Sequence, residues 1–150
     1  MLSAFASAPH WLAVLLTFAL VMAVVVMHYE VLARVNVLLP RWRQLPPRTR
    51  VLVVMITLVL LHVVEIWIFG VGIYAVNWMP SLGLIHGVER LELLDAVYLS
   101  ATTYTTLGFG DLVPHGPIRF LVGTEALAGL LLITWSASFT YLEMQRDWRG

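Results

Sequence analysis

The sequence of 150 residues contains no cysteine and no lysine, and only 12% of its residues are charged. Without cysteine, the chain has neither a disulfide framework nor a thiolate metal site. An ordinary soluble domain is ~25% charged, whereas 60% of this chain is hydrophobic and its mean hydropathy is +0.86. These proportions exclude a disordered chain, a nucleic-acid binder and an ordinary soluble enzyme. The chain has too few polar residues to cover the surface of a small globular protein. We therefore expect lipid to surround much of it.

Three hydrophobic segments are long enough to cross a bilayer, which takes ~20 mostly apolar residues. We predict transmembrane helices at residues 1–39, 51–79 and 117–142. A shorter, threonine-rich stretch at 91–104 lies between the second and third spans, where it could enter the membrane only as a re-entrant helix shielded by protein. The predicted fold class is therefore an all-α membrane protein with three transmembrane helices and one re-entrant helix.

The distribution of arginine predicts the orientation in the membrane. The linker at residues 40–50 contains four arginines and three prolines, and the tail at 143–150 contains two more arginines. Positively charged segments stay in the cytoplasm, so we expect the N-terminus and the linker at 80–90 outside a cell inner (plasma) membrane, and the C-terminus inside. The first residues lack the basic patch of a secretory signal, so the first span is expected to be retained.

The segment TLGFGD at residues 106–111 has a composition suited to binding a cation. Its alternating glycines permit backbone conformations closed to other residues, so that successive carbonyls can point the same way. A row of carbonyls can replace the hydration shell of a monovalent cation. Thr106 adds a hydroxyl at the inner end of this row, and Asp111 adds a carboxylate at the outer end. A helix before the segment would aim its negative C-terminal end at the ion path.

This segment resembles the TVGYGD signature of the potassium-channel pore-loop family, with Leu107 in place of valine and Phe109 in place of tyrosine. The preceding DAVYLSATTYTT resembles the pore helix of that family. The sequence HVVEIW at 62–67, together with Glu125 and the Trp135-Ser136 pair, is similar to small bacterial three-transmembrane-helix ion-channel-like proteins. The resemblance implies a potassium-selective channel that conducts K⁺ passively and is not an enzyme.

The resemblance also implies an organisation and a set of site residues. The pore domain would cover residues 51–142, with a pore helix at 91–104 and a filter at 105–111. Four filters around one axis imply a homotetramer in the lipid bilayer, with K⁺ as the permeant ion and no cofactor. The filter residues would be Thr106, Leu107, Gly108, Phe109 and Gly110, of which the first four bind K⁺; Asp111 would lie at the outer mouth, and Thr102, Thr103 and Thr105 would support the filter.

Two positions depart from the family pattern. Phe109 lacks the hydroxyl that tyrosine would offer to the pore helix, so we expect apolar packing to support the outer filter. Thr102 stands where some members of the family carry a buried glutamate, so that carboxylate must come from another residue if it is present at all.

In the third span, Gly129 is either a gating hinge or a point of close helix packing. The stripe Ile133, Ser136 and Thr140 follows it at helical spacing, and we expect this stripe to face the cavity below the filter.

Ionisable residues within the spans are costly and usually face the protein interior. His62 and Glu65 share a helix face, and Glu125 lies at a similar depth in the third span. These three form either a proton-sensitive gating cluster or a set of hydrogen bonds that ties helices together, with a metal site as a further alternative. We expect His28 and Glu30 to reach the membrane interface with Arg34. His115 is either a sensor of external pH or a solvated loop residue.

Two alternative functions share this architecture: a weakly selective cation channel, and a non-conducting membrane sensor that keeps the pore fold. A voltage sensor would need several arginines through one span, whereas the first span has only Arg34. Any gating stimulus must therefore act on the membrane part, the short linkers or an unseen regulator.

Overall fold

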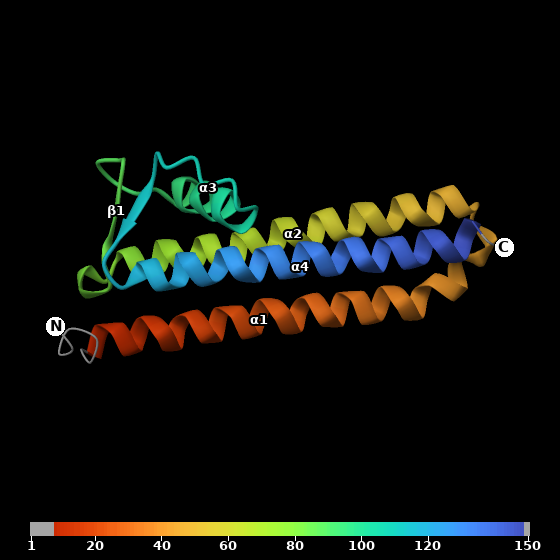
Figure 1. The fold of residues 1–150 in the computed structure, drawn as a ribbon, viewed down its shortest axis with the longest axis horizontal. Helices are drawn as coiled ribbons and strands as arrows, with labels where there is room; N and C mark the ends of the chain where they lie inside the picture. Colours follow the sequence, from red (N-terminus) through yellow and green to blue (C-terminus); the bar gives the residue numbers. More distant parts are fainter. Residues whose placement is uncertain (1–7, 149–150) are drawn as a thin grey trace.

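The computed structural model describes residues 8–148 of the chain (Figure 1). The predicted ends of the first span and of the tail, residues 1–7 and 149–150, lie outside the described residues. Three long helices dominate the fold, with a short helix and a small sheet between the second and the third. In chain order the elements are α1 (Ala8–Leu38), the 3-10 helix η2 (Leu39–Gln44), α2 (Pro47–Asn77), the 3-10 helix η3 (Pro80–Leu82), β1 (Leu84–His86), α3 (Leu93–Tyr104), β2 (Val113–His115) and α4 (Ile118–Trp148).

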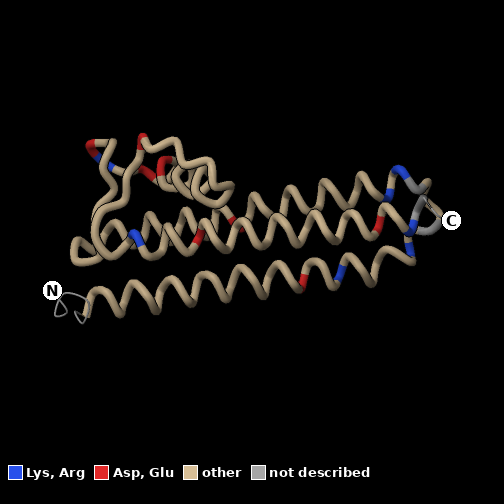
Figure 2. Tube along the Cα trace, viewed as in Figure 1, with Lys and Arg blue, Asp and Glu red and all other residues tan. Residues whose placement is uncertain are grey.

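The helices α1, α2 and α4 run alongside one another, and α3 packs against α2 and α4 near one end of the bundle (Figure 1). The chain enters α1 at the end that carries β1, and α4 finishes at the opposite end. Figure 2 shows basic residues gathered at that opposite end and most acidic residues near α3 and the sheet. This separation of charge follows the pattern from which the orientation was predicted.

Three segments are long and apolar enough to cross a membrane: Ala8–Trp42, Arg48–Asn77 and Ile118–Arg146. The predicted all-α membrane fold with three spans and a short helix between the last two is therefore confirmed. Two boundaries differ from the prediction. Proline is tolerated in the first turn of a helix, so α2 begins at Pro47 and not at residue 51. The helix α4 continues past residue 142, where an ion pair of 2.5 Å joins Glu143 to Arg146 one turn later.

A two-stranded antiparallel sheet, in which Ile85 pairs with Pro114, was not predicted. It connects the segment before α3 to the segment after the loop at 105–111, so it closes that region into one unit. Gly83 and Gly87 flank β1 with φ of +120° and +115°, and a Cβ at either one would collide with a carbonyl oxygen of the opposite segment. Strands of three residues are too short to show an alternating pattern in the sequence.

The apolar core surrounds the C-terminal end of α3. Phe69 of α2, Val24 of α1 and Leu132 of α4 pack in one cluster with the fully buried Tyr104. A second cluster joins α3 to the C-terminal part of α2 and the N-terminal part of α4, and a third joins α1 to the N-terminal half of α2. The loop after α3 is thus held by packed helices behind it.

Candidate functional site

The loop at residues 105–111 follows α3 and has a left-handed backbone at every second residue. The φ angles of Thr106, Gly108 and Gly110 are +60°, +54° and +81°. Thr106 is the one non-glycine residue with positive φ in the part of the chain that the structure describes, and such a conformation is uncommon outside glycine. This alternation is a backbone arrangement that lets successive carbonyls project to one side. Every residue of the loop is exposed in the single chain.

The end of α3 holds this loop through backbone hydrogen bonds. The amide of Gly108 donates to the carbonyl of Thr102 at 3.0 Å, and the amide of Thr106 donates to the carbonyl of Thr103 at 2.8 Å. The hydroxyl of Thr105 donates back to Ala101 at 2.7 Å. Of the three threonines predicted to support the filter, Thr102 and Thr103 hold the loop through their main-chain carbonyls, and Thr105 is the first residue of the loop itself.

At the outer end of the loop, Tyr98 of α3 contacts both Phe109 and Asp111. Its hydroxyl donates to the Asp111 carboxylate at 2.8 Å, and its ring stacks on Phe109 with centroids 6.5 Å apart and an interplanar angle of 10°. The hydrogen bond to Asp111 raises the pKa of Tyr98. The expected apolar support of Phe109 is present as this stack, whereas the role of Tyr98 in binding Asp111 was not predicted.

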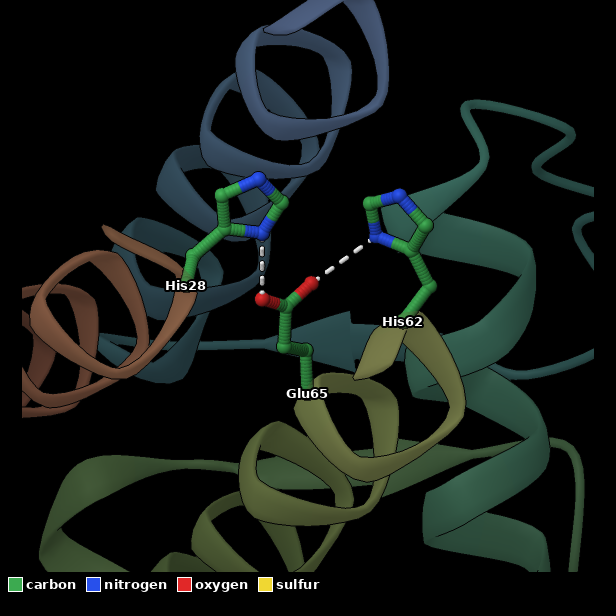
Figure 3. Close-up of side chains that lie close together, drawn as sticks. All are labelled: His28, His62 and Glu65. Atoms are coloured by element: carbon green, nitrogen blue, oxygen red, sulfur yellow. Dashed lines mark hydrogen bonds and ion pairs between the residues drawn. The ribbon is translucent and has the colours of Figure 1, made fainter. Parts of the chain in front are cut away.

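A buried polar cluster lies behind the loop, where His28, His62 and Glu65 point toward one another (Figure 3). The Nδ1 atom of His28 is 2.7 Å from one carboxylate oxygen of Glu65, and Nδ1 of His62 is 2.9 Å from the other. The Tyr104 hydroxyl also donates to Glu65, at 2.5 Å. His28 and Glu65 are 0% exposed. One carboxylate of α2 thus binds α1 and the last residue of α3.

The prediction that His28 reaches the membrane interface is wrong, because this side chain is fully buried against Glu65. His28 lies on the helix face that α1 buries, with Val24 one turn before and Leu32 one turn after, and since α1 is apolar on all sides the sequence does not mark this face. Glu30 and Arg34 lie on the exposed side, where they approach to 3.8 Å. Tyr104 was not predicted as part of the cluster at all.

Glu125 binds a different group from the one predicted. The Ser100 hydroxyl of α3 lies 2.5 Å from its Oε1 atom and 2.8 Å from the carbonyl of Ile66. Within the described residues, the buried Oε2 atom of Glu125 has no hydrogen-bond partner. The three residues predicted to form one cluster therefore lie in two places. His62 and Glu65 contact Tyr104, whereas Glu125 contacts Ser100. Both carboxylates contact α3 on the side away from the loop. They are therefore the other residues that could supply the carboxylate absent at Thr102.

Comparison with known proteins bears on what this arrangement does. Residues 61–145, more than half of the chain, match the family described as "Ion channel". The chain belongs to this ion channel family. The matched region contains α3, the loop, most of α4 and about half of α2. The predicted resemblance to the potassium-channel pore-loop family is confirmed, and the chain is a multi-pass membrane protein.

The chain is similar to two curated proteins over part of its length. The chain is 31% identical over 80 residues to "Inward rectifier potassium channel Kirbac3.1" of Paramagnetospirillum magnetotacticum. The aligned residues make up 53% of this chain and 27% of the relative. It is 42% identical over 45 residues to "Protein LctB" of Bacillus caldotenax. Here the aligned residues make up 29% of this chain and 34% of the relative. The matches thus span about a quarter to a third of each relative. No solved structure matches the chain.

In this channel-family fold, α4 presents a different face from the one predicted. Ser136 and Thr140 are buried, and together with Ile133 they line a cleft of about 400 Å³ against α2. The prediction that this stripe faces a cavity below the filter is wrong for the single chain, because small polar residues can also serve contacts between helices. The exposed face of α4 instead carries Gly123, Leu127, Leu131, Thr134 and Ser138.

Gly129 lies where α4 touches the end of α3. A Cβ at this position would collide with the carbonyl oxygen of Tyr104, so the structure favours close packing over a hinge. His115 lies exposed on β2 with its ring centroid 4.3 Å from that of His86 on β1. Whether His115 senses external pH or is only a solvated loop residue remains a prediction.

Proposed function

We propose that the chain is one subunit of a homotetrameric, potassium-selective channel in which K⁺ crosses the membrane passively between four copies of residues 105–111. The observation that supports this most directly is the left-handed backbone at Thr106, Gly108 and Gly110. Carbonyls in such a row replace the water around a dehydrated K⁺ ion. The K⁺ ligands would be Thr106, Leu107, Gly108 and Phe109, and Asp111 would attract cations to the outer mouth.

The exposure of the loop supports an assembly of several chains. Every residue of the loop is exposed in one chain, Leu107 and Phe109 by 58% and 65%, although non-helical backbone at membrane depth must be buried in protein or line a water-filled cavity. Four loops around one axis would cover them and place the carbonyls inside, and closed symmetry is the usual arrangement of identical subunits. The exposed α4 face with Thr134 and Ser138 would then line the inner cavity.

The relative named as an inward rectifier potassium channel supports potassium as the permeant ion. The basic end of the bundle (Figure 2) supports a cytoplasmic linker at 40–50 and a filter that faces outward from a cell inner membrane. With one arginine in α1 before η2, we propose that gating does not use a voltage sensor. Passive conduction requires no cofactor and no enzymatic step.

Ion flux through liposomes that contain the purified chain tests this function. With K⁺ and Na⁺ on opposite sides, the reversal potential should follow the K⁺ gradient. Gly108→Ala and Gly110→Ala should abolish K⁺ flux, because alanine resists the positive φ at both positions. Val26→Ala is the control, since Val26 is an exposed residue of α1 outside the region that matches the ion channel family. Equal K⁺ and Na⁺ permeability would favour the weakly selective alternative, and no flux at all would favour the non-conducting one.

A further inference from the structure

The cluster in Figure 3 contains a set of donor atoms that ion conduction does not use. We propose that His28, His62 and Glu65 form a binding site for a divalent transition-metal ion of the zinc class. The three residues offer one ligand atom each, and these atoms all lie within 4.8 Å of one another. Two imidazole nitrogens and one carboxylate oxygen are ligands that Zn²⁺ prefers, and three protein ligands leave one position open.

The distances fit such a site after a small adjustment. The two histidine Nδ1 atoms lie 2.7 and 2.9 Å from the Glu65 oxygens. Nitrogen and oxygen ligands bind Zn²⁺ at ~2.0–2.2 Å, so their mutual separation in a tetrahedral site is roughly 3.3 Å. The contacts would therefore open by about half an ångström. The Tyr104 hydroxyl lies beside the same atoms, 2.9 Å from Nδ1 of His62.

Outer contacts hold the histidine rings in this orientation. The Ser136 hydroxyl of α4 lies 3.4 Å from Nε2 of His28, the nitrogen that faces away from Glu65. Metal-binding histidines usually have such a partner on their other nitrogen, which fixes the tautomer and the ring. The ring of Trp135 packs beside His28, with centroids 5.4 Å apart. Helices α1 to α4 all contribute to the site or its surroundings.

Charge and access also favour a cation here. A buried carboxylate must be paired or must bind a metal, and Glu65 is paired with histidines, which are charged only when protonated. A divalent ion would supply the same compensation to two neutral histidines. His62 is 18% exposed and opens into the cleft of about 400 Å³ between α2 and α4. His62 is therefore the ligand at the accessible edge of the cluster.

Metal binding to the full-length, tag-free chain in detergent tests the proposal. We expect equilibrium dialysis against Zn²⁺ to give one metal per chain, and Co²⁺ to give the visible absorption of a tetrahedral site. His28→Asn and His62→Asn should each weaken binding at least about tenfold, since asparagine keeps a hydrogen bond to Glu65 but is a poor zinc ligand. The double variant His86→Asn/His115→Asn is the matched control and should bind as the wild type does.

The possible outcomes separate this site from the other histidines and from conduction. Loss of binding in the double variant, or no binding in the wild type, overturns the proposal, because the ion would then bind at β1 and β2 or not at all. His62 lies at the edge of the cleft, so His62→Asn decides the question if His28→Asn does not fold. Because the readout is bound metal and not flux, a failure of the proposed K⁺ selectivity leaves the result interpretable.

Discussion

Glu65 and Glu125 are both fully buried carboxylates behind α3, but they differ in their partners. Glu65 interacts with His28, His62 and Tyr104, which occupy both of its oxygens. Glu125 accepts one hydrogen bond from Ser100, and its second oxygen has no partner among residues 8–148. The same Glu→Gln substitution should therefore have different effects at the two positions.

We expect Glu65→Gln to destabilise the folded chain by about 3–5 kcal/mol, because an amide nitrogen would replace an oxygen that accepts hydrogen bonds from a buried network. Glu125→Gln should cost less than about 1 kcal/mol, because the amide oxygen can still accept from Ser100 and the NH₂ group takes the side without a partner. Thermal unfolding in detergent measures both values. Equal losses would contradict the difference in bonding that we describe.

The same two variants test the prediction that the buried carboxylates couple protonation to the filter. Open probability of single channels against pH should shift in Glu65→Gln, because Tyr104 ends the helix that carries the loop and bonds directly to this carboxylate. Glu125→Gln tests the same effect through Ser100. If the curves of both variants superimpose on the wild-type curve, the cluster ties the helices together and does not gate.

Tyr98 gives a prediction at alkaline pH. Its hydrogen bond to Asp111 raises its pKa above the usual 10.0, so the contribution of this bond is fully present below pH 10 and is lost as the pH rises through the raised pKa. We expect Asp111→Asn to move the ionisation of Tyr98 back toward 10.0. Tyrosinate absorbance during alkaline titration measures this shift, and superimposed titrations of wild type and Asp111→Asn would show that the bond is absent in solution.

Residue types and spacing alone could locate some of these side chains but not their partners. The glycines at 108 and 110 were predictable because few other residues accept a positive φ. His28 was placed wrongly, and Tyr104 was not identified, because their partner Glu65 lies 37 and 39 residues away in the sequence. Because the long helices are apolar on all sides, their hydrophobic pattern shows neither which face is buried nor which residue that face meets.

Among the elements, the contacts of α3 with α4 and with α2 each depend on one glycine. Gly129 lies against the backbone of Tyr104, and Gly70 of α2 lies against Val97, whose Cα would be 2.7 Å from an added Cβ. Small residues of this kind let helix backbones approach closely in membranes. The short helix α3 is thus held on two sides by glycine contacts.

If packing and not hinge motion explains Gly129, Gly129→Ala should destabilise the fold by about 1–3 kcal/mol, the usual cost of extra volume in a packed core. Gly123→Ala on the open face of α4 should not destabilise it. Thermal unfolding of both variants measures the difference. A Gly129→Ala variant with unchanged stability but altered opening rates would instead support the hinge.

The helices were more predictable than the connections between them. Long apolar runs and prolines marked α1, α2 and α4, since each of these signals acts within a few residues. The sheet of β1 and β2 depends on segments almost thirty residues apart with α3 between them. The stripe Ile133, Ser136 and Thr140 was assigned to the cavity because helical spacing predicts a shared face, but not whether α2 or water covers that face.

At the scale of the whole molecule, orientation can be tested because the chain has no native cysteine. Glu89→Cys, in the exposed linker after β1, should react with an impermeant thiol reagent added to intact cells. Gln44→Cys, exposed in η2 at the basic end, should react only after the membrane is permeabilised. The reverse pattern would place the loop at 105–111 on the cytoplasmic side. Gly87 is unsuitable for this purpose, since a side chain there would collide with Asp111.

Assembly and ion binding should be linked, because the proposed K⁺ sites exist only where four loops meet. A ligand that binds the assembled state stabilises it by mass action, by about 2.7 kcal/mol at a hundredfold excess over its dissociation constant. We therefore expect a complex of four 16.9 kDa chains that dissociates at a lower temperature when Na⁺ replaces K⁺. In Gly108→Ala this difference between the two ions should disappear, whereas Val26→Ala, at an exposed position of α1, should keep it. The same K⁺ dependence in Gly108→Ala would mean that the ion stabilises the complex elsewhere, and the assignment of residues 105–111 as the filter would fail.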